Sequence, residues 1–441
     1  MSSGLGSGAG ALRELALDGL GRGDLALAEQ YFARLLELLP QDAEALQFLA
    51  ARHVQRGDTL RGIALLLEAA KVRPDDAEVW HQLGSARMQA NDWQGAVASL
   101  RQCVKLAPSL FVARLRLGIS LEQLGDTHAA LLTYFGAVNT AQGMGRWMSD
   151  ATTAPGLRDA VKHAIRFIDA GRRPIFDAVL APLRERYGAG ELTRVEHCLA
   201  IYLGERPAPL PDPRQKPKFL YFPDIPSQPY YPVERFPWQA ELEAATDMVR
   251  EELRAVLAEQ ERLLPFLGEH TEEQLKEYLQ SSGKQTAAWD AFFFYRHGER
   301  FDDNCARAPR TAALLESLPL VRIRDHAPET LYSVLRPGTH ILPHRGVTNT
   351  RLVTHLPLIV PSDCALNVGG EIHEWQEGRC VSFDDTFEHE AWNRSGDTRV
   401  VMILDSWNPD LTEVERLAVT DLVEAIGDFN RASEVPAPGE A

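Results

Sequence analysis

The types and spacing of a histidine and an arginine near the end of the chain indicate which kind of metal site they could form. Residues 387–405, FEHEAWNRSGDTRVVMILD, place His389 between two glutamates and put Arg399 ten positions later at the start of an apolar run. A zinc-protease helix needs a second histidine four residues after the first, and Asn393 occupies that position. Iron oxygenases instead bind the metal through two histidines and a carboxylate, and leave positions for a 2-oxoacid and dioxygen. Arg399 fits that chemistry, because a fixed guanidinium can neutralise the far carboxylate of the 2-oxoacid in an apolar cavity.

The second histidine of such a site is expected at His344, in ILPHRG. The carboxylate of the usual iron triad often lies two residues after the first histidine, but Gly346 occupies that place. Either a distant acid or a water must then be the third ligand. Three acids near His389 are close enough in sequence to help, although acids beside turns are usually solvated: Asp384, Asp385 and Glu388. His340 and His373 are expected on loops or on solvent-facing strand positions.

These residues lie in a region whose periodicity is that of short strands. Beyond about residue 285, extended runs such as TLYSVL, RLVTHLPLIVP and TRVVMILDSW alternate with turn residues, including Gly369-Gly370 and Ser395-Gly396-Asp397. Many short antiparallel strands in about 120 residues are typical of a double-sheet jelly-roll or cupin-like fold. That architecture can hold a metal between its sheets.

The N-terminal part has a helical repeat instead. Pro40, Pro74 and Pro108 are 34 residues apart, and small residues recur with the same period at Ala28, Gly62, Ala96 and Ala130. Small residues let paired helices approach closely, while proline ends the second helix of each unit. The pattern resembles the tetratricopeptide repeat over residues 9–144. Such repeats stack into a concave surface that commonly holds peptides or partner domains.

The rest of the chain connects these two regions. Residues 145–205 are predicted as a helical extension that caps the repeats, and residues 206–238 as a proline-rich linker whose aromatic residues pack on the next domain. The catalytic domain is expected over residues 239–425, with its β core at about 285–410. The predicted class is therefore α+β and multidomain, with an all-α tetratricopeptide solenoid followed by a double-stranded β-helix.

Composition limits the partners and the compartment. The 441 residues carry a net charge of −16 and no basic run interleaved with aromatics, which argues against nucleic acid as a partner. The five cysteines form no CxxC pair, and no apolar stretch approaches the ~20 residues that would span a bilayer. The N-terminal residues lack a basic region followed by an apolar core. We therefore expect a cytoplasmic protein that does not bind a membrane.

The segments LYSVLRPGTHILPHRGVTNTRLVTHLPLIVP, FDDTFEHEAWN and TRVVMILDSWNPDLT, in this order, resemble the aspartyl/asparaginyl β-hydroxylases, which are Fe(II)- and 2-oxoglutarate-dependent oxygenases. The resemblance runs from about Pro226 to Thr412, and members of that family in animals also carry tetratricopeptide repeats before the catalytic domain. The resemblance implies that His344 and His389 bind iron and that Arg351 lies near the substrate. It also implies that four residues surround 2-oxoglutarate: Ser333, Arg399, His355 and Trp289.

The resemblance also implies an activity. The expected reaction uses 2-oxoglutarate and dioxygen to hydroxylate the β-carbon of Asp or Asn in a peptide or protein, which the repeats would help to hold. Two alternatives stay open: hydroxylation of a free or carrier-bound amino acid or another small molecule, and a scaffold without catalysis. Animal members have a second arginine where this chain has Val353. One fewer cation near the reacting centre puts an acidic substrate in doubt.

Overall fold

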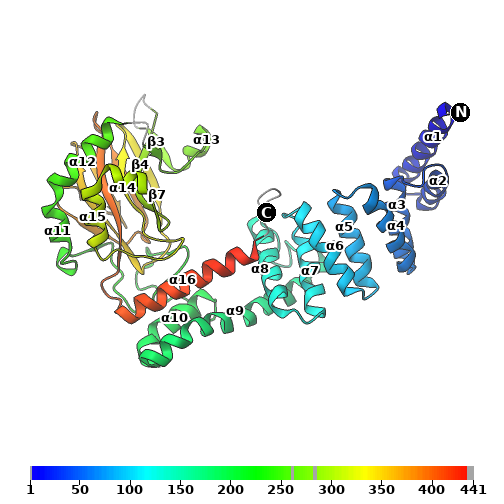
Figure 1. Cartoon of the computed structure of the whole chain (residues 1–441), viewed down its shortest axis with the longest axis horizontal. Coiled ribbons are helices and arrows are strands. Elements are labelled where there is room, and N and C mark those ends of the chain that lie inside the picture. Colours follow the sequence, from blue (N-terminus) through cyan, green and yellow to red (C-terminus); the bar gives the residue numbers. More distant parts are fainter. Residues whose placement is uncertain (1, 260–262, 282–285, 435–441) are drawn as a thin grey trace. The chain divides into compact units, whose positions relative to one another are not determined.

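The computed structural model describes residues 2–259, 263–281 and 286–434, and these divide into two compact units (Figure 1). The first unit runs to Arg172 and also includes the described residues from Asp428 onward; the second runs from Arg173 to Gly427. The division falls inside two helices, α9 (Arg158–Tyr187) and α16 (Glu413–Ser433), and not at the proline-rich segment.

The first unit is a series of antiparallel helical hairpins. Its helices are α1 (Ser2–Gly21), α2 (Leu25–Leu38), α3 (Ala43–Gln55), α4 (Thr59–Val72), α5 (Ala77–Gln89), α6 (Trp93–Leu106), α7 (Phe111–Gln123) and α8 (Thr127–Gly143). Aspartates cap the N-termini of several, as Asp24, Asp92 and Asp126 do by accepting a hydrogen bond from a backbone N–H of the first turn. Ala28, Ala96 and Ala130 are fully buried, which agrees with the packing role predicted for the small residues. The expected solenoid of helical repeats is confirmed.

The second unit contains two antiparallel sheets. In the larger one, the strands follow the order β1-β11-β8-β13-β6-β4-β2, with β5 paired to β4; in the smaller one, the order is β10-β9-β12-β7-β3. The strands of the larger sheet are β1 (Tyr230–Tyr231), β2 (Leu264–Pro265), β4 (Trp289–Arg296), β5 (Glu299–Arg300), β6 (Thr330–Leu335), β8 (Arg351–Ile359), β11 (Val381–Phe383) and β13 (Arg399–Trp407). The strands of the smaller sheet are β3 (Leu279–Ser281), β7 (Thr339–His344), β9 (Cys364–Val368), β10 (Glu371–Glu374) and β12 (His389–Asn393). The predicted double-sheet class is confirmed; the predicted core boundary at residue 285 lies outside the described residues.

Buried apolar clusters pack on both faces of the larger sheet. On one face, Leu253 and Val256 of α12 (Thr246–Ala258) belong to the same buried cluster as Phe292 and Met402 of the sheet. On the other face, Leu335 and Val401 share a buried cluster with residues of the smaller sheet, such as Leu366. The remaining helices of this unit are α10 (Thr193–Tyr202), α11 (Gln239–Ala244), α13 (Glu272–Leu275), α14 (Asp302–Arg307) and α15 (Pro309–Ser317). The candidate site lies on the face that the two sheets share.

The proline-rich segment is part of the second unit and is packed on it, as its aromatic content predicted. Leu220 and Phe222 are buried, and the backbone N–H and C=O of Phe222 both bond to the side-chain amide of Asn349. Farther along, Tyr230 and Tyr231 form β1, which extends the larger sheet beside β11. The segment is therefore a component of the sheet domain and not a free linker.

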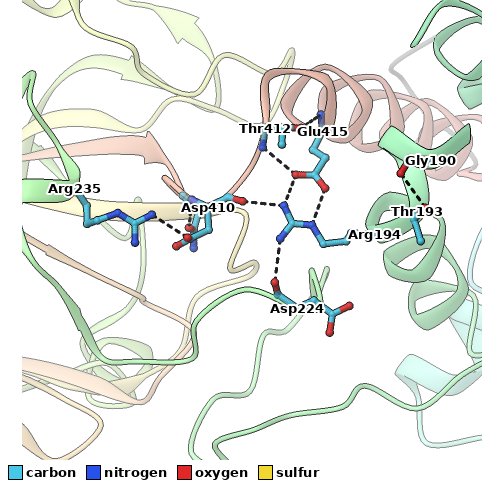
Figure 2. A network of polar contacts seen from close by, with 9 residues as sticks. Gly190, Thr193, Arg194, Asp224, Arg235, Asp410, Thr412 and Glu415 are labelled. Carbon is cyan, nitrogen blue, oxygen red and sulfur yellow. Dashed lines mark hydrogen bonds and ion pairs between the residues drawn. The ribbon is translucent and has the colours of Figure 1, made fainter. Parts of the chain in front are cut away.

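An arginine on α10 ties that helix to the same unit (Figure 2). Arg194 donates from Nε to Oε1 of Glu415 at 2.7 Å, and its two terminal nitrogens donate to the backbone carbonyls of Asp224 and Asp410 at 2.9 and 2.8 Å. The carboxylate of Glu415 also accepts from the backbone N–H of Thr412. One guanidinium thus joins α10, the proline-rich segment and the start of α16.

No helix in the described ranges is long and apolar enough to cross a membrane.

Candidate active site

Two histidines face each other across the smaller sheet. His344 ends β7 and His389 begins β12, and the two are register partners whose ring centroids lie 4.1 Å apart. Nδ1 of His344 lies 2.9 Å from the carbonyl oxygen of Leu342, and Nδ1 of His389 lies 3.1 Å from that of Phe387. A donated Nδ1–H at each contact fixes the ring and leaves Nε2 as the nitrogen with a free lone pair, which is the form that binds a metal.

Burial keeps both imidazoles neutral. It lowers the pKa of His344, and burial together with the nearby His344 lowers the pKa of His389 to about 3. Neutral imidazoles bind a divalent cation without first losing a proton. Within the described part of the chain, the two histidines do not belong to a cluster of three or more His, Cys, Asp or Glu side chains arranged to hold a metal.

A carboxylate from another segment lies against Gly346. A Cβ atom at Gly346 would overlap the carboxylate of Asp385, so only glycine leaves room for it. Asp384 and Asp385 are both buried, which corrects the expectation that acids beside this turn are solvated. Asp384 accepts hydrogen bonds from Gln215 and Thr386 and serves the loop, whereas Oδ1 of Asp385 has no hydrogen-bond partner among the described residues.

A buried arginine on the larger sheet has no acidic partner in the part of the chain that the structure describes. Arg399 is 1% exposed, and Nη1 lies 3.3 Å from both the carbonyl oxygen and Oγ of Ser333. Its guanidinium carbon lies 4.8 Å from the ring centre of Trp375. No ion pair joins Arg399 to an acid of the described residues, and burial lowers its pKa to about 10. Its Nε is buried and has no hydrogen-bond partner among the described residues, so the group is prepared to receive an anion.

Trp289 and His355 complete the surroundings of Arg399. The indole Nε1 of Trp289 donates to Oγ of Ser333 at 2.9 Å, and its ring stacks on Phe266 with the centroids 3.8 Å apart. His355 is buried, and its Nδ1 has no partner among the described residues. Burial and the charge of Arg399 lower the pKa of His355 well below its usual value, so this imidazole is neutral.

The positive charge of the second arginine, Arg351, is already balanced by buried acids. Its Nη1 donates to Oδ1 of Asp405 at 2.6 Å, and its Nη2 lies 3.4 Å from Oδ2 of Asp385. Burial alone would lower the pKa of Arg351, but the charges of Asp405 and Asp385 outweigh it and raise the pKa. Glu329 lies beside this group, and burial raises its pKa to about 7.

All seven residues proposed for the site line one cavity of about 230 Å³. Leu331, Ile341, Leu366, Phe383 and Ile403 are among its apolar walls. The structure also places three acids in the cavity: Asp385, which was expected to be solvated, and Glu329 and Asp405, which were not predicted as site residues. Asp405 carried a usable signal, because it is an acid inside the apolar strand VVMILDSW. Glu329 carried none.

Family models match segments in both regions of the chain. Residues 243–409 match the family model described as aspartyl/asparaginyl beta-hydroxylase, and residues 77–110 match a tetratricopeptide-repeat model. The resemblance predicted from the sequence motifs is confirmed for these segments.

Several curated relatives are similar to part of this chain. The human aspartyl/asparaginyl beta-hydroxylase is 37% identical over 134 residues, which are 30% of this chain and 18% of that protein. Aspartate beta-hydroxylase domain-containing protein 2 of Rattus norvegicus is 34% identical over 48% of this chain and 60% of its own length. The ornithine lipid ester-linked acyl 2-hydroxylase of Rhizobium tropici is 33% identical over 43% of this chain and 64% of its own. The chain therefore spans less than two thirds of each of these relatives.

Among solved structures, a crystal structure of MamA protein aligns with 37% of this chain and 81% of its own, with 19% sequence identity and a TM-score of 0.32.

Proposed function

We propose that this chain, whose residues 243–409 form a domain of the aspartyl/asparaginyl β-hydroxylase family, is an Fe(II)- and 2-oxoglutarate-dependent hydroxylase. The observation that carries the proposal is Arg399, a buried guanidinium without an acidic partner among the described residues, in the same cavity as a pair of neutral histidines. A buried cation is costly unless an anion reaches it. A dicarboxylate that binds metal at one end meets this need at the other.

The donor set fits iron. His344 and His389 would hold the metal through Nε2, since each Nδ1 is turned to a backbone carbonyl. The Asp385 carboxylate lies beside Gly346, where a Cβ atom would overlap it. When bound, Fe(II) would supply, with dioxygen and 2-oxoglutarate, the oxidation that inserts oxygen into a C–H bond and leaves succinate and CO2.

The chain's own residues would bind and orient the co-substrate. Arg399 and the hydroxyl of Ser333 would receive the distal carboxylate, and Trp289 would hold that hydroxyl in place through its indole N–H. His355, neutral and unbonded at Nδ1, can donate to an oxygen of the keto-acid end. The apolar walls would exclude water from the reacting centre.

The favoured substrate is a peptide or protein that is hydroxylated at the β-carbon of an Asp or Asn residue. The helical repeats would help to hold this substrate. A cleft in the first unit between α3, α5 and α7 supports this proposal. Arg116 lies half-buried in it, against His81 and Ser85. Exchanging Arg116 for alanine should raise the KM for a peptide substrate and leave 2-oxoglutarate consumption without substrate unchanged, while the exposed Arg101→Ala serves as the control.

A lipid or other small molecule is the second candidate substrate class. The relative from Rhizobium tropici, named as an acyl 2-hydroxylase of ornithine lipid, favours it. For this class, Arg116→Ala would leave the KM unaltered. A lipid extract, and not a peptide mixture, would stimulate succinate formation.

The proposal is tested by succinate production from 2-oxoglutarate, with protein purified without oxygen and then given Fe(II) and air. The expected result is succinate formation by the wild type that is lost in both His344→Ala and Arg399→Ala. If the wild type forms no succinate with or without cell lysate as a source of substrate, the proposal is wrong and a non-catalytic scaffold becomes the better explanation.

A further inference from the structure

The two ends of the cavity differ in charge. At one end, Arg399 has no acidic partner among the described residues. At the other end, Arg351 is surrounded by Asp385, Asp405 and Glu329, so three carboxyl groups meet one guanidinium. The distal carboxylate of 2-oxoglutarate belongs at the Arg399 end, which leaves the acidic end for the substrate.

Arg351 has little capacity left for a substrate anion. It is in ion pairs with Asp405 at 2.6 Å and with Asp385 at 3.4 Å, and its side chain is mostly buried with theirs. A substrate carboxylate placed here would have to displace a buried acid or lie against it without a counterion. Either arrangement is unfavourable, because like charges in a desolvated site repel strongly.

Asp385 favours a substrate that brings a hydrogen-bond donor. The residue is 6% exposed and lines the cavity, and its Oδ1 accepts no hydrogen bond from the described residues. Leaving a buried acceptor without a donor is unfavourable, so a ligand that brings an N–H group is favoured. Val353 also lines the cavity, directly opposite Asp405 in the strand register, and offers neither charge nor hydrogen bond.

We propose that the side chain hydroxylated by this protein is a neutral amide, asparagine, and that aspartate is rejected. This inference rests on the proposed function. The amide NH2 would donate to Asp385 and satisfy its free oxygen, whereas the isosteric aspartate would bring a fourth carboxylate beside Arg351. Selectivity therefore comes mainly from repulsion of the wrong substrate.

The test uses the full-length protein with Mn(II) in place of iron, saturating 2-oxoglutarate at pH 8, and two matched probes. These are N-acetyl-asparagine N-methylamide and the aspartate compound of the same shape. Mn(II) broadens the NMR signals of a nearby ligand, so the broadening of the β-protons gives an affinity without turnover. The asparagine probe should bind at least tenfold more tightly than the aspartate probe.

Two variants connect the preference to the acids. Glu329→Gln should reduce the ratio at least threefold by strengthening aspartate binding, because it removes one carboxylate and keeps the shape. Glu299→Gln, an exposed acid on β5, is the matched control and should leave the ratio unchanged.

The outcomes separate this inference from the proposed function. If the signals of 2-oxoglutarate itself are not broadened, the proposed function fails. If they are broadened and aspartate binds as tightly as asparagine, or the asparagine probe does not bind, the inference on the substrate is wrong while the proposed co-substrate site stands.

Discussion

Replacing Arg399 with methionine should make the ligand-free protein more stable while abolishing co-substrate binding. The guanidinium is buried and has no acidic partner among the described residues, and the fall of its pKa from 12.5 to about 10 corresponds to about 3 kcal/mol against the charged form. Part of that gain is offset by the loss of the Ser333 contacts and of the packing on Trp375. We expect a net increase of about 1–2 kcal/mol in the free energy of unfolding, since methionine fills a similar volume without a charge.

The same exchange should remove stabilisation by the ligand. In the wild type with Fe(II) and without oxygen, 2-oxoglutarate at 100 times its Kd should raise the free energy of unfolding by about 2.7 kcal/mol. In Arg399→Met the distal carboxylate would face an apolar wall. Loss of a buried charge-paired contact costs about 2–5 kcal/mol of binding free energy, so the added stability should vanish at that concentration.

Urea unfolding of both proteins, with and without Fe(II) and 2-oxoglutarate, measures the two effects together. Arg399→Lys is the control, because it keeps the charge and therefore should not stabilise the ligand-free protein. A ligand-free Arg399→Met protein less stable than the wild type by more than 1 kcal/mol, with stabilisation by 2-oxoglutarate intact, would refute the reasoning that this cation is kept for a ligand.

Three further predictions concern the other end of the site. His389→Ala should reduce Fe(II) affinity at least 100-fold in a metal titration, since only one imidazole remains; unchanged affinity would exclude His389 as a ligand. Gly346→Ala should lower the free energy of unfolding by about 1–3 kcal/mol, because its Cβ overlaps the Asp385 carboxylate, and an unaltered urea midpoint would contradict that packing. Burial raises the pKa of Glu329 from 4.5 to about 7, so the folded state binds this proton more tightly, and the stability that the protonated group contributes is lost as pH rises through 7. Glu329→Gln should therefore be about 3 kcal/mol more stable than the wild type at pH 8 and nearly equal to it near pH 4.5; a difference that does not change with pH would contradict this.

The site residues that the sequence identified share one property: each stands in a recognisable local motif. His344 in ILPHRG, His389 in FEHEAWN and Arg399 before an apolar run could be found by residue type and spacing. Their convergence follows from topology, because β7 and β12 pair in one sheet while β13 crosses the facing one. The double sheet was predictable for the same reason, since turn residues separate its short strands.

What the sequence did not reveal depends on tertiary burial. Asp385 follows a strand at a turn and looks solvated, yet the proline-rich segment lies over that turn, and Gln215 bonds to the adjacent Asp384. Glu329 precedes a strand like many surface acids, and only the fold places it beside Arg351. The division between the two units lies within the continuous helices α9 and α16, and in α9 the residues Gly171 and Pro174 flank it.

Recognition of the distal carboxylate by Arg399 can be measured by comparing 2-oxoglutarate with pyruvate, which has the same keto-acid end but lacks the distal carboxylate. Each is titrated without oxygen into the Fe(II)-loaded protein, and binding is followed by the visible absorption of the keto acid on the metal. The wild type should bind 2-oxoglutarate at least 100-fold more tightly than pyruvate, a difference of about 2.7 kcal/mol, and Arg399→Met should bind both equally. Equal affinity in the wild type would contradict the claim that Arg399 recognises a second carboxylate.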